Sequence, residues 1–215
     1  MATYQPNKAI STRYHGYNFR SRLEARWAVV FETLGLNWRY EAEGWQSPSG
    51  DRWLPDFLLE IQGKKVWVEI KPPGHGDEEV LGRMAEGMSG DEYIWAIAAD
   101  IPDPKRLSEE WDPIWQGHYG GSLEGQFDMF FRWRLEDGAE GVGQDNNYYL
   151  CICVDCSTVG IQFDRRSARI DCGCPKGGPE FGIGDKNYTS SHPTILKAYA
   201  AARAARFEHD DREVW

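Results

Sequence analysis

Two acidic residues and a lysine, Asp56, Glu69 and Lys71, lie in two short apolar runs, and together they could carry out metal-dependent chemistry. The runs, residues 53–59 and 66–71, are rich in β-branched and aromatic residues, and a polar linker with a glycine separates them. This pattern predicts two strands joined as a β-hairpin. Because strand side chains alternate between two faces, Glu69 and Lys71 point the same way. Pairing of the strands would bring Asp56 and Glu69 to one point.

Two carboxylates held a few ångströms apart repel each other, which favours a cation between them. A hard divalent cation such as Mg²⁺ prefers carboxylate and water oxygens as ligands. The ammonium of Lys71 would stabilise an attacking hydroxide or a charged phosphoryl transition state. The alternative is a surface ion pair on a half-exposed hairpin, which contributes roughly 0–1 kcal/mol to stability. The elements around the hairpin favour the first interpretation.

The segments around the hairpin predict the element order α-β-β-β-α-β. Residues 21–34 carry apolar residues at helical spacing, and Gly35 follows as a stop signal. Residues 37–45 alternate as a first strand, residues 77–87 predict a second helix, and residues 92–99 predict a buried strand. The polar lead-in before this first helix predicts little regular structure.

The order of motifs resembles the PD-(D/E)XK nuclease superfamily. Pro55-Asp56 stands thirteen positions before Glu69-Ile70-Lys71, counted from acid to acid, and residues 19–28 resemble the opening helix of small phage and prophage members. The resemblance implies an α/β restriction-endonuclease-like core, in which helices flank a central mixed sheet. It covers residues 14–100 well and leaves residues 100–147 unassigned.

The resemblance also implies a site. Asp56 and Glu69 would bind Mg²⁺ or Mn²⁺, together with Glu24 from the first helix and the backbone carbonyl of Ile70. Lys71 would orient the attacking water or help to deprotonate it.

Glu24 has a second interpretation, because Ser21-x-x-Glu24 is also a capping box in which the glutamate reaches back to the backbone of the N-cap residue. Two other polar residues stand near the predicted site. Glu43 in the first strand could enter it, and His75 in the loop after Lys71 could contact a phosphate or a water. Solvent exposure is the alternative for both.

The cysteines predict a second, structural metal site. Cys153-x-x-Cys156 and Cys172-x-Cys174, with fifteen residues between the pairs, match a four-thiolate zinc knuckle, and the intervening residues predict a β-hairpin. Cys151 is expected as a strand residue, although it could replace Cys153 as a ligand. The alternative is a set of reduced thiols without metal. Similar phage nuclease-like proteins carry such a zinc ribbon after the core.

Charge and composition limit which partners the protein is expected to bind. The chain has 215 residues and a net charge of −10, which argues mildly against nucleic acid, but residues 1–27 and 160–206 each carry an excess of four positive charges. No apolar run is long enough to cross a membrane and no signal peptide is evident, so we expect the cytoplasm, that of the host if a phage encodes the protein. Phosphate contacts are expected from five arginines: Arg20, Arg22, Arg165, Arg166 and Arg169.

The sequence therefore predicts a metal-dependent nuclease that hydrolyses phosphodiester bonds in DNA during phage or prophage DNA processing. The alternative is a catalytically silent nuclease-fold module that binds and interferes with a host defence or nucleic-acid-processing protein. A third hypothesis is a zinc-ribbon nucleic-acid binder with the core as scaffold. The expected division is a core at 1–147, with the insert at 100–147, and a cysteine-rich segment with a last helix at 148–215. The oligomeric state stays open.

Overall fold

A six-stranded mixed sheet forms the centre of the computed structural model, which describes residues 9–109, 126–153, 155–163, 167–170, 172, 174, 188–189 and 191–207. The strand order is β10-β9-β8-β7-β6-β3. Only β7 and β8 pair in parallel, and the other neighbours are antiparallel. The strands are β3 (Asn37–Tyr40), β6 (Phe57–Ile61), β7 (Lys64–Lys71), β8 (Glu92–Ala98), β9 (Gln126–Arg134) and β10 (Glu140–Asp145). The predicted α/β class with a central mixed sheet is confirmed.

The predicted hairpin exists as β6 and β7, but its first strand begins at Phe57 instead of Trp53, and its turn is tighter than the polar linker indicated. Ile61 pairs with Lys64, so the loop consists only of Gln62 and Gly63. Their φ angles are +52° and +72°, as the type I′ turn between two right-twisted strands requires. The register places Leu58 opposite Trp67, which fixes which side chains share a face.

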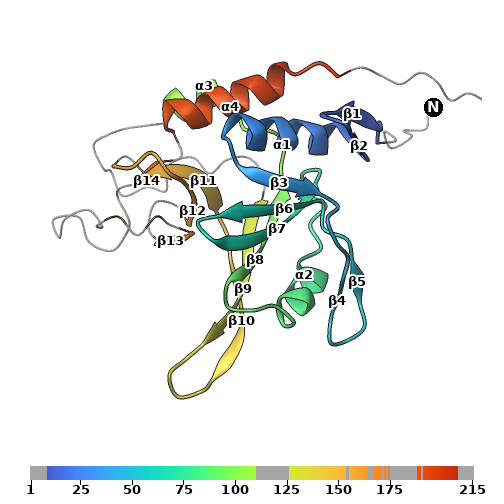
Figure 1. The fold of residues 1–215 in the computed structure, drawn as a ribbon, viewed down its shortest axis with the longest axis vertical. Helices are drawn as coiled ribbons and strands as arrows, with labels where there is room; N and C mark the ends of the chain where they lie inside the picture. Colours follow the sequence, from blue (N-terminus) through green and yellow to red (C-terminus); the bar gives the residue numbers. More distant parts are fainter. Residues whose placement is uncertain are drawn as a thin grey trace, which may run out of the picture.

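Helices cover both faces of the sheet (Figure 1). On one face α1 (Arg22–Thr33) and α4 (Pro193–Ala204) lie side by side. They enclose a core that includes Trp27, Phe57, Trp95 and Tyr199. On the other face α2 (Glu78–Ala85) covers a second cluster that includes Leu58, Trp67, Leu81 and Met84. The short α3 (Pro104–Glu109) contacts α4.

Two small hairpins replace expected irregular or continuous segments. β1 (Thr12–Tyr14) and β2 (Tyr17–Phe19) pair where little regular structure was predicted, and the positive φ angles of His15 and Gly16 form their turn. The strand expected over residues 37–45 ends at Tyr40, because Glu41 has a φ of +44° and turns the chain. The chain then forms β4 (Trp45–Gln46) and β5 (Arg52–Trp53), which pair with each other outside the central sheet.

The cysteine-rich segment forms a second sheet in the order β13-β12-β11-β14. Its strands are β11 (Tyr148–Cys153), β12 (Val159–Phe163), β13 (Ser167–Ile170) and β14 (Tyr188–Thr189), and β12 with β13 is the predicted hairpin. The larger hydrophobic core continues into this sheet through Leu150, Ile161 and Ile170. The division at residue 147 stays a prediction, and the two parts share one core.

Residues 126–145, within the unassigned insert, form β9 and β10 of the central sheet, whereas residues 110–125 lie outside the described part. The predicted last helix exists as α4, which ends at Ala204. Among the helices that the structure describes, none has the length and apolar character needed to cross a membrane.

Candidate functional site

Three separate elements bring Glu24, Asp56, Glu69 and Lys71 together; with Arg20, we call this group the carboxylate centre. Glu24 belongs to the first turn of α1, Asp56 immediately precedes β6, and Glu69 and Lys71 end β7. All three carboxylates are buried, with 6%, 2% and 8% of the residue exposed. Glu69 and Glu24 lie near enough to Asp56 for their charges to act on it, and Trp53, in β5, packs with Leu58.

Asp56 is held from two sides. Its Oδ2 accepts a hydrogen bond of 2.7 Å from the backbone N–H of Ile70, and its Oδ1 lies 2.7 Å from Nη2 of Arg20. Burial and then the negative charges of Glu69 and Glu24 raise the pKa of Asp56 to about 7. Ile70 thus contributes its N–H here, and the predicted ligand role of its carbonyl stays a prediction.

Glu69 and Lys71 form an ion pair at the end of β7. The other oxygen of Glu69 accepts a hydrogen bond of 2.7 Å from the indole N–H of Trp53. Burial lowers the pKa of Lys71, but the hydrogen bond and the charge of Glu69 outweigh it, so this pKa is raised overall. Lys71 is therefore a cation at neutral pH.

Of the two hydrogen bonds of the predicted capping box, the structure contains the one from the N–H of Glu24 to the side chain of Ser21. Ser21 is the N-cap of α1 and accepts a 3.1 Å hydrogen bond from the N–H of Glu24. The glutamate returns to the N–H of Arg20 at 3.1 Å instead of to that of Ser21. The same oxygen accepts a 2.7 Å hydrogen bond from the hydroxyl of Tyr40. These contacts fix the carboxylate beside Arg20 and Asp56.

The carboxylates of this centre suit a hard divalent cation, although Arg20 and Lys71 already pair with two of them. Glu41 lies 2.8 Å from Nε of Arg20, so the group then holds four carboxylates and the two cations Arg20 and Lys71, of which Asp56, Glu41 and Glu69 are ion-paired. This leaves a charge of −2 when all are ionised, which a divalent cation would neutralise. Within the described residues, however, only four cysteines bring three or more potential metal ligands within 4.8 Å of one another. Asp56 and Glu69 would have to exchange Arg20 and Lys71 for the ion.

Sequence reasoning assigned Arg20 to phosphates and missed Tyr40 and Trp53. The structure instead directs Arg20 to Asp56 and Glu41, a contact across the fold that no local pattern encodes.

A fourth buried acid was also missed. Asp128 on β9 is 3% exposed and lies across Ala96 from Glu69, because both residues pair with Ala96 in register. Burial, followed by the charge of Glu78, raises the pKa of Asp128 to about 6, although a hydrogen bond from Gln144 lowers it. Glu69 and Asp128 thus share one sheet face, about 10 Å apart by strand spacing. The shared face of Asp128 and Glu69 follows only from the place of β9 beside β8 in the sheet, because residues 126–134 contain no acidic motif that would predict it.

The other predicted site residues lie apart from the centre or outside the described residues. Glu43 and His75 are exposed, as their alternative interpretation has it. Arg22 is half-buried and lines a separate pocket at the start of α1. The side chains of Arg165, Arg166 and Arg169 lie outside the described part of the chain.

Four cysteines form the second candidate centre and could hold a metal such as zinc. The sulfur atoms of Cys153, Cys156, Cys172 and Cys174 all lie within 4.8 Å of one another. The predicted set is thus assembled with Cys153, while Cys151 is buried outside the group. Four thiolates at such spacing suit tetrahedral Zn²⁺.

Short hydrogen bonds fix the chain around Cys153 and Cys156. The N–H of Ser157 donates to the carbonyl of Cys153 at 2.8 Å, and Ser157 takes a φ of +61°. The Cys156 sulfur forms a 3.1 Å hydrogen bond with the Thr158 hydroxyl. This contact, with the Thr158 backbone and Cys172, lowers the pKa of the Cys156 thiol to about 6. Cys156 is thereby prepared to bind metal as a thiolate.

Comparisons with protein-family models, curated proteins and solved structures found no match to this chain. Its function must therefore be inferred from the two centres themselves.

Proposed function

We propose that the protein is a metal-dependent nuclease of the PD-(D/E)XK type that hydrolyses phosphodiester bonds in DNA. The observation that carries the proposal is the buried cluster of Glu24, Asp56 and Glu69 with a lysine beside it. Burial of Asp56, and then the charges of Glu69 and Glu24, raise its pKa to about 7, which is an electrostatic cost to the folded protein. Functional sites commonly contain such costs.

The proposed roles follow from the contacts of each side chain. Asp56 and Glu69, with Glu24 nearby, would hold Mg²⁺ or Mn²⁺, which would activate a water and polarise the phosphate. Lys71, ion-paired and with a raised pKa, acts as a hydrogen-bond donor to the water or to the developing phosphoryl charge rather than as a base. Arg20, half-exposed, can turn from Asp56 to the substrate when the metal is bound.

Cleavage of DNA tests the proposal. Purified protein is incubated with plasmid, single-stranded and branched DNA in Mg²⁺ or Mn²⁺, with EDTA as the inhibitor control. Lys71→Ala and Asp56→Asn should each reduce the rate about a hundredfold or more. Lys65→Ala is the matched control, because Lys65 lies on the same face at the other end of β7 and pairs with Glu92 at 3.7 Å. A fully active Lys71→Ala protein would remove Lys71 from the mechanism.

A second candidate function is a binding module without catalysis, acting on a host defence or nucleic-acid-processing protein. One observation favours it: Arg20 and Lys71 already neutralise Asp56 and Glu69 within the protein. In that case Mn²⁺ would neither bind at the centre nor support cleavage of any substrate. Titration calorimetry with MnCl₂, on the protein and on Asp56→Asn, separates the two candidates.

For the cysteine centre we propose one structural Zn²⁺. All four positions are filled by protein sulfur, which leaves no open site for substrate. Its contribution is to tie β11 to the segment that carries Cys172 and Cys174.

A further inference from the structure

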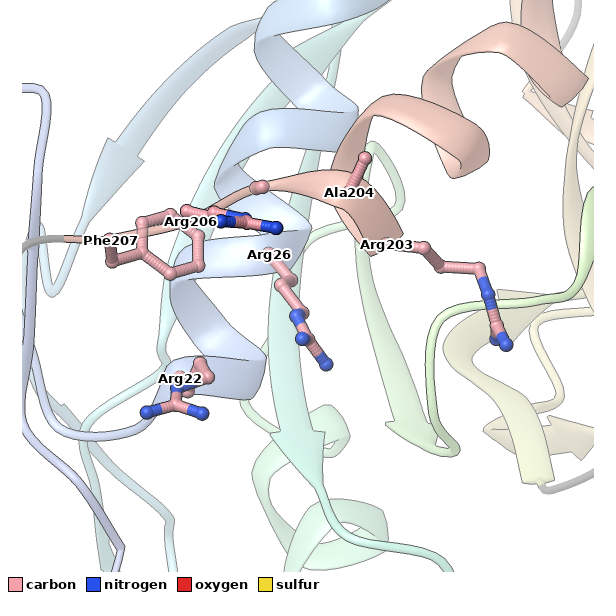
Figure 2. Close-up of a pocket in the computed structure, with 7 residues that line it drawn as sticks. Arg22, Arg26, Arg203, Ala204, Arg206 and Phe207 are labelled. Carbon is pink, nitrogen blue, oxygen red and sulfur yellow. The ribbon is translucent and has the colours of Figure 1, made fainter.

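A pocket of about 610 Å³ lies between the start of α1 and the end of α4, and arginines dominate its lining. Arg22 and Arg26 come from α1, Arg203 from the last turn of α4, and Arg206 from the segment that follows. Figure 2 shows these four side chains around the pocket, with Phe207 on one side. None of the described residues that line it is acidic. We call it the arginine pocket.

The positive charge of these arginines contrasts with the negative net charge of the whole chain. The chain carries a net charge of −10, yet four cations gather at one place. Arg22 and Arg26 are four residues apart on one helix, a spacing at which like charges destabilise the helix. Glu24, between them in sequence, is directed away into the carboxylate centre, where it contacts Tyr40. It therefore does not compensate the pair.

The structure leaves hydrogen-bonding capacity at the pocket. Nε of Arg26 is buried and has no hydrogen-bond partner. Among the ion pairs of the described residues, neither Arg26 nor Arg206 takes part in one. Arg203 is different, since Nη1 donates to the carbonyl of Ile101 at 2.8 Å and Nη2 lies 3.8 Å from Asp103. Arg203 is thus anchored at the pocket, while Arg26 and Arg206 have donors to offer.

Guanidinium groups recognise phosphate oxygens through paired N–H donors, and a buried N–H without an acceptor is costly until an anion arrives. Arg26 and Arg206, with the positive charges of Arg22 and Arg203 beside them, line a pocket of about 610 Å³, which is larger than one phosphate needs and favours a polyanion over a small phosphorylated ligand. We propose that the arginine pocket binds successive backbone phosphates of the nucleic-acid strand on which the carboxylate centre acts. The inference rests on the proposed function, and the first two turns of α1 contribute to both sites.

Fluorescence anisotropy of a short labelled DNA duplex, titrated with the full chain in CaCl₂ over a range of NaCl concentrations, tests the proposal. Arg26→Ala/Arg206→Ala should weaken binding about tenfold or more and reduce the slope of log K against log salt by about 1–2. Arg39→Ala/Arg134→Ala is the matched control, because it removes the same charge from two exposed positions on β3 and β9. Circular dichroism and a second pair, Arg26→Gln/Arg206→Gln, exclude a folding defect as the cause.

Equal affinity and salt slope in the pocket variants and the control would overturn the pocket as a phosphate site, whether or not the protein cleaves DNA. Conversely, loss of binding in the pocket variants of a protein that never cleaves would retain the pocket and sink the nuclease. A thermal shift with sodium pyrophosphate, seen in the wild type and lost in the pocket variants while duplex affinity stays the same, would assign a small phosphorylated ligand and overturn the backbone assignment.

Discussion

Arg20 illustrates how one side chain changes the chemistry of its neighbours. It lies between Asp56 and Glu41 and is itself half-exposed, so it offsets buried negative charge at the edge of the fold. A metal-binding centre would need this arginine to leave, whereas a silent module would need it to stay. The energetic role of Arg20 therefore discriminates between the two functions.

Replacing Arg20 by alanine should destabilise the metal-free protein by roughly 1–2 kcal/mol above pH 7, a value reduced from that of a buried pair because Arg20 is 55% exposed. If the centre binds cations, MnCl₂ should stabilise this variant more than the wild type, because the ion takes over the charge of the guanidinium. Urea unfolding with and without MnCl₂ measures both effects, and Arg39→Ala serves as the surface control. A variant indifferent to MnCl₂ would count against a cation site.

Asp128 predicts a pH effect that does not depend on metal. Its pKa of about 6 in the fold exceeds the ordinary value of 3.8, so the folded state binds the proton more tightly than the unfolded state does. Stability from this residue is therefore greatest at acid pH and falls as the pH rises from about 4 to about 6. Asp128→Asn removes the titration and should be more stable than the wild type at pH 8 by about 1–3 kcal/mol.

Urea unfolding at pH 4 and pH 8 checks this expectation, since the difference between Asp128→Asn and the wild type should shrink at the lower pH. Glu43→Gln removes one charge from an exposed position and controls for the change in net charge. If Asp128→Asn were equally or less stable than the wild type at pH 8, burial would not be costing this carboxylate free energy.

At the scale of elements, the sequence predicted what local patterns encode. The stripe of α1, its N-cap Ser21 and its stop at Gly35 with a φ of +67° are all local, and so is the hairpin of β6 and β7. Asp56 and Glu69 could be expected together because one short turn joins their strands. The single strand predicted over residues 53–59 was wrong at its start, because a break at residues 54–56 separates β5 from β6 and the two strands belong to different sheets.

The missing parts of the centre depend on contacts between distant segments. Tyr40 reaches Glu24, and Arg20 reaches Asp56, only after α1 has packed against the sheet. Asp128 joins the face of Glu69 because β9 pairs beside β8, and that choice is made by burial of Phe127 and Met129 rather than by any motif. The cysteine set, by contrast, could be predicted as far as its members, since spacing alone identifies two ligand pairs.

The turn that carries Cys153 and Cys156 leads to a test of the metal. Purified protein should contain one zinc per chain by elemental analysis, and Cys156→Ser or Cys172→Ser should lose most of it. Cys151→Ala should keep its zinc, because that sulfur lies outside the group. Cys151 is buried, so this control should be somewhat less stable while still binding the metal. Zinc retained by Cys172→Ser and lost by Cys151→Ala would reverse the assignment.

At the scale of the whole molecule, the shared core determines how the two sheets respond to damage. Trp95 in the central sheet donates its indole N–H to the carbonyl of Tyr148 at 3.0 Å. Tyr199 of α4 packs against Trp27 of α1, and both belong to the cluster that contains Leu150 and Ile161. A protein with one continuous core unfolds as one unit, whereas two independent domains unfold in two steps.

Thermal unfolding should therefore be a single transition, and removing zinc with a chelator should shift that transition to lower temperature without splitting it. Zinc loss weakens the segment around Cys172, but β11 stays tied to the central sheet through Tyr148 and Leu150, so the destabilisation spreads through the common core. Near-ultraviolet circular dichroism and intrinsic tryptophan fluorescence, recorded on the same samples, should give coincident curves. Tyr199→Ala opens a cavity beneath α4 and should reduce the free energy of unfolding by about 3–5 kcal/mol. Both curves should therefore shift together to lower temperature. Separate transitions in the chelated protein would instead establish the boundary at residue 147 as a real limit between two folding units.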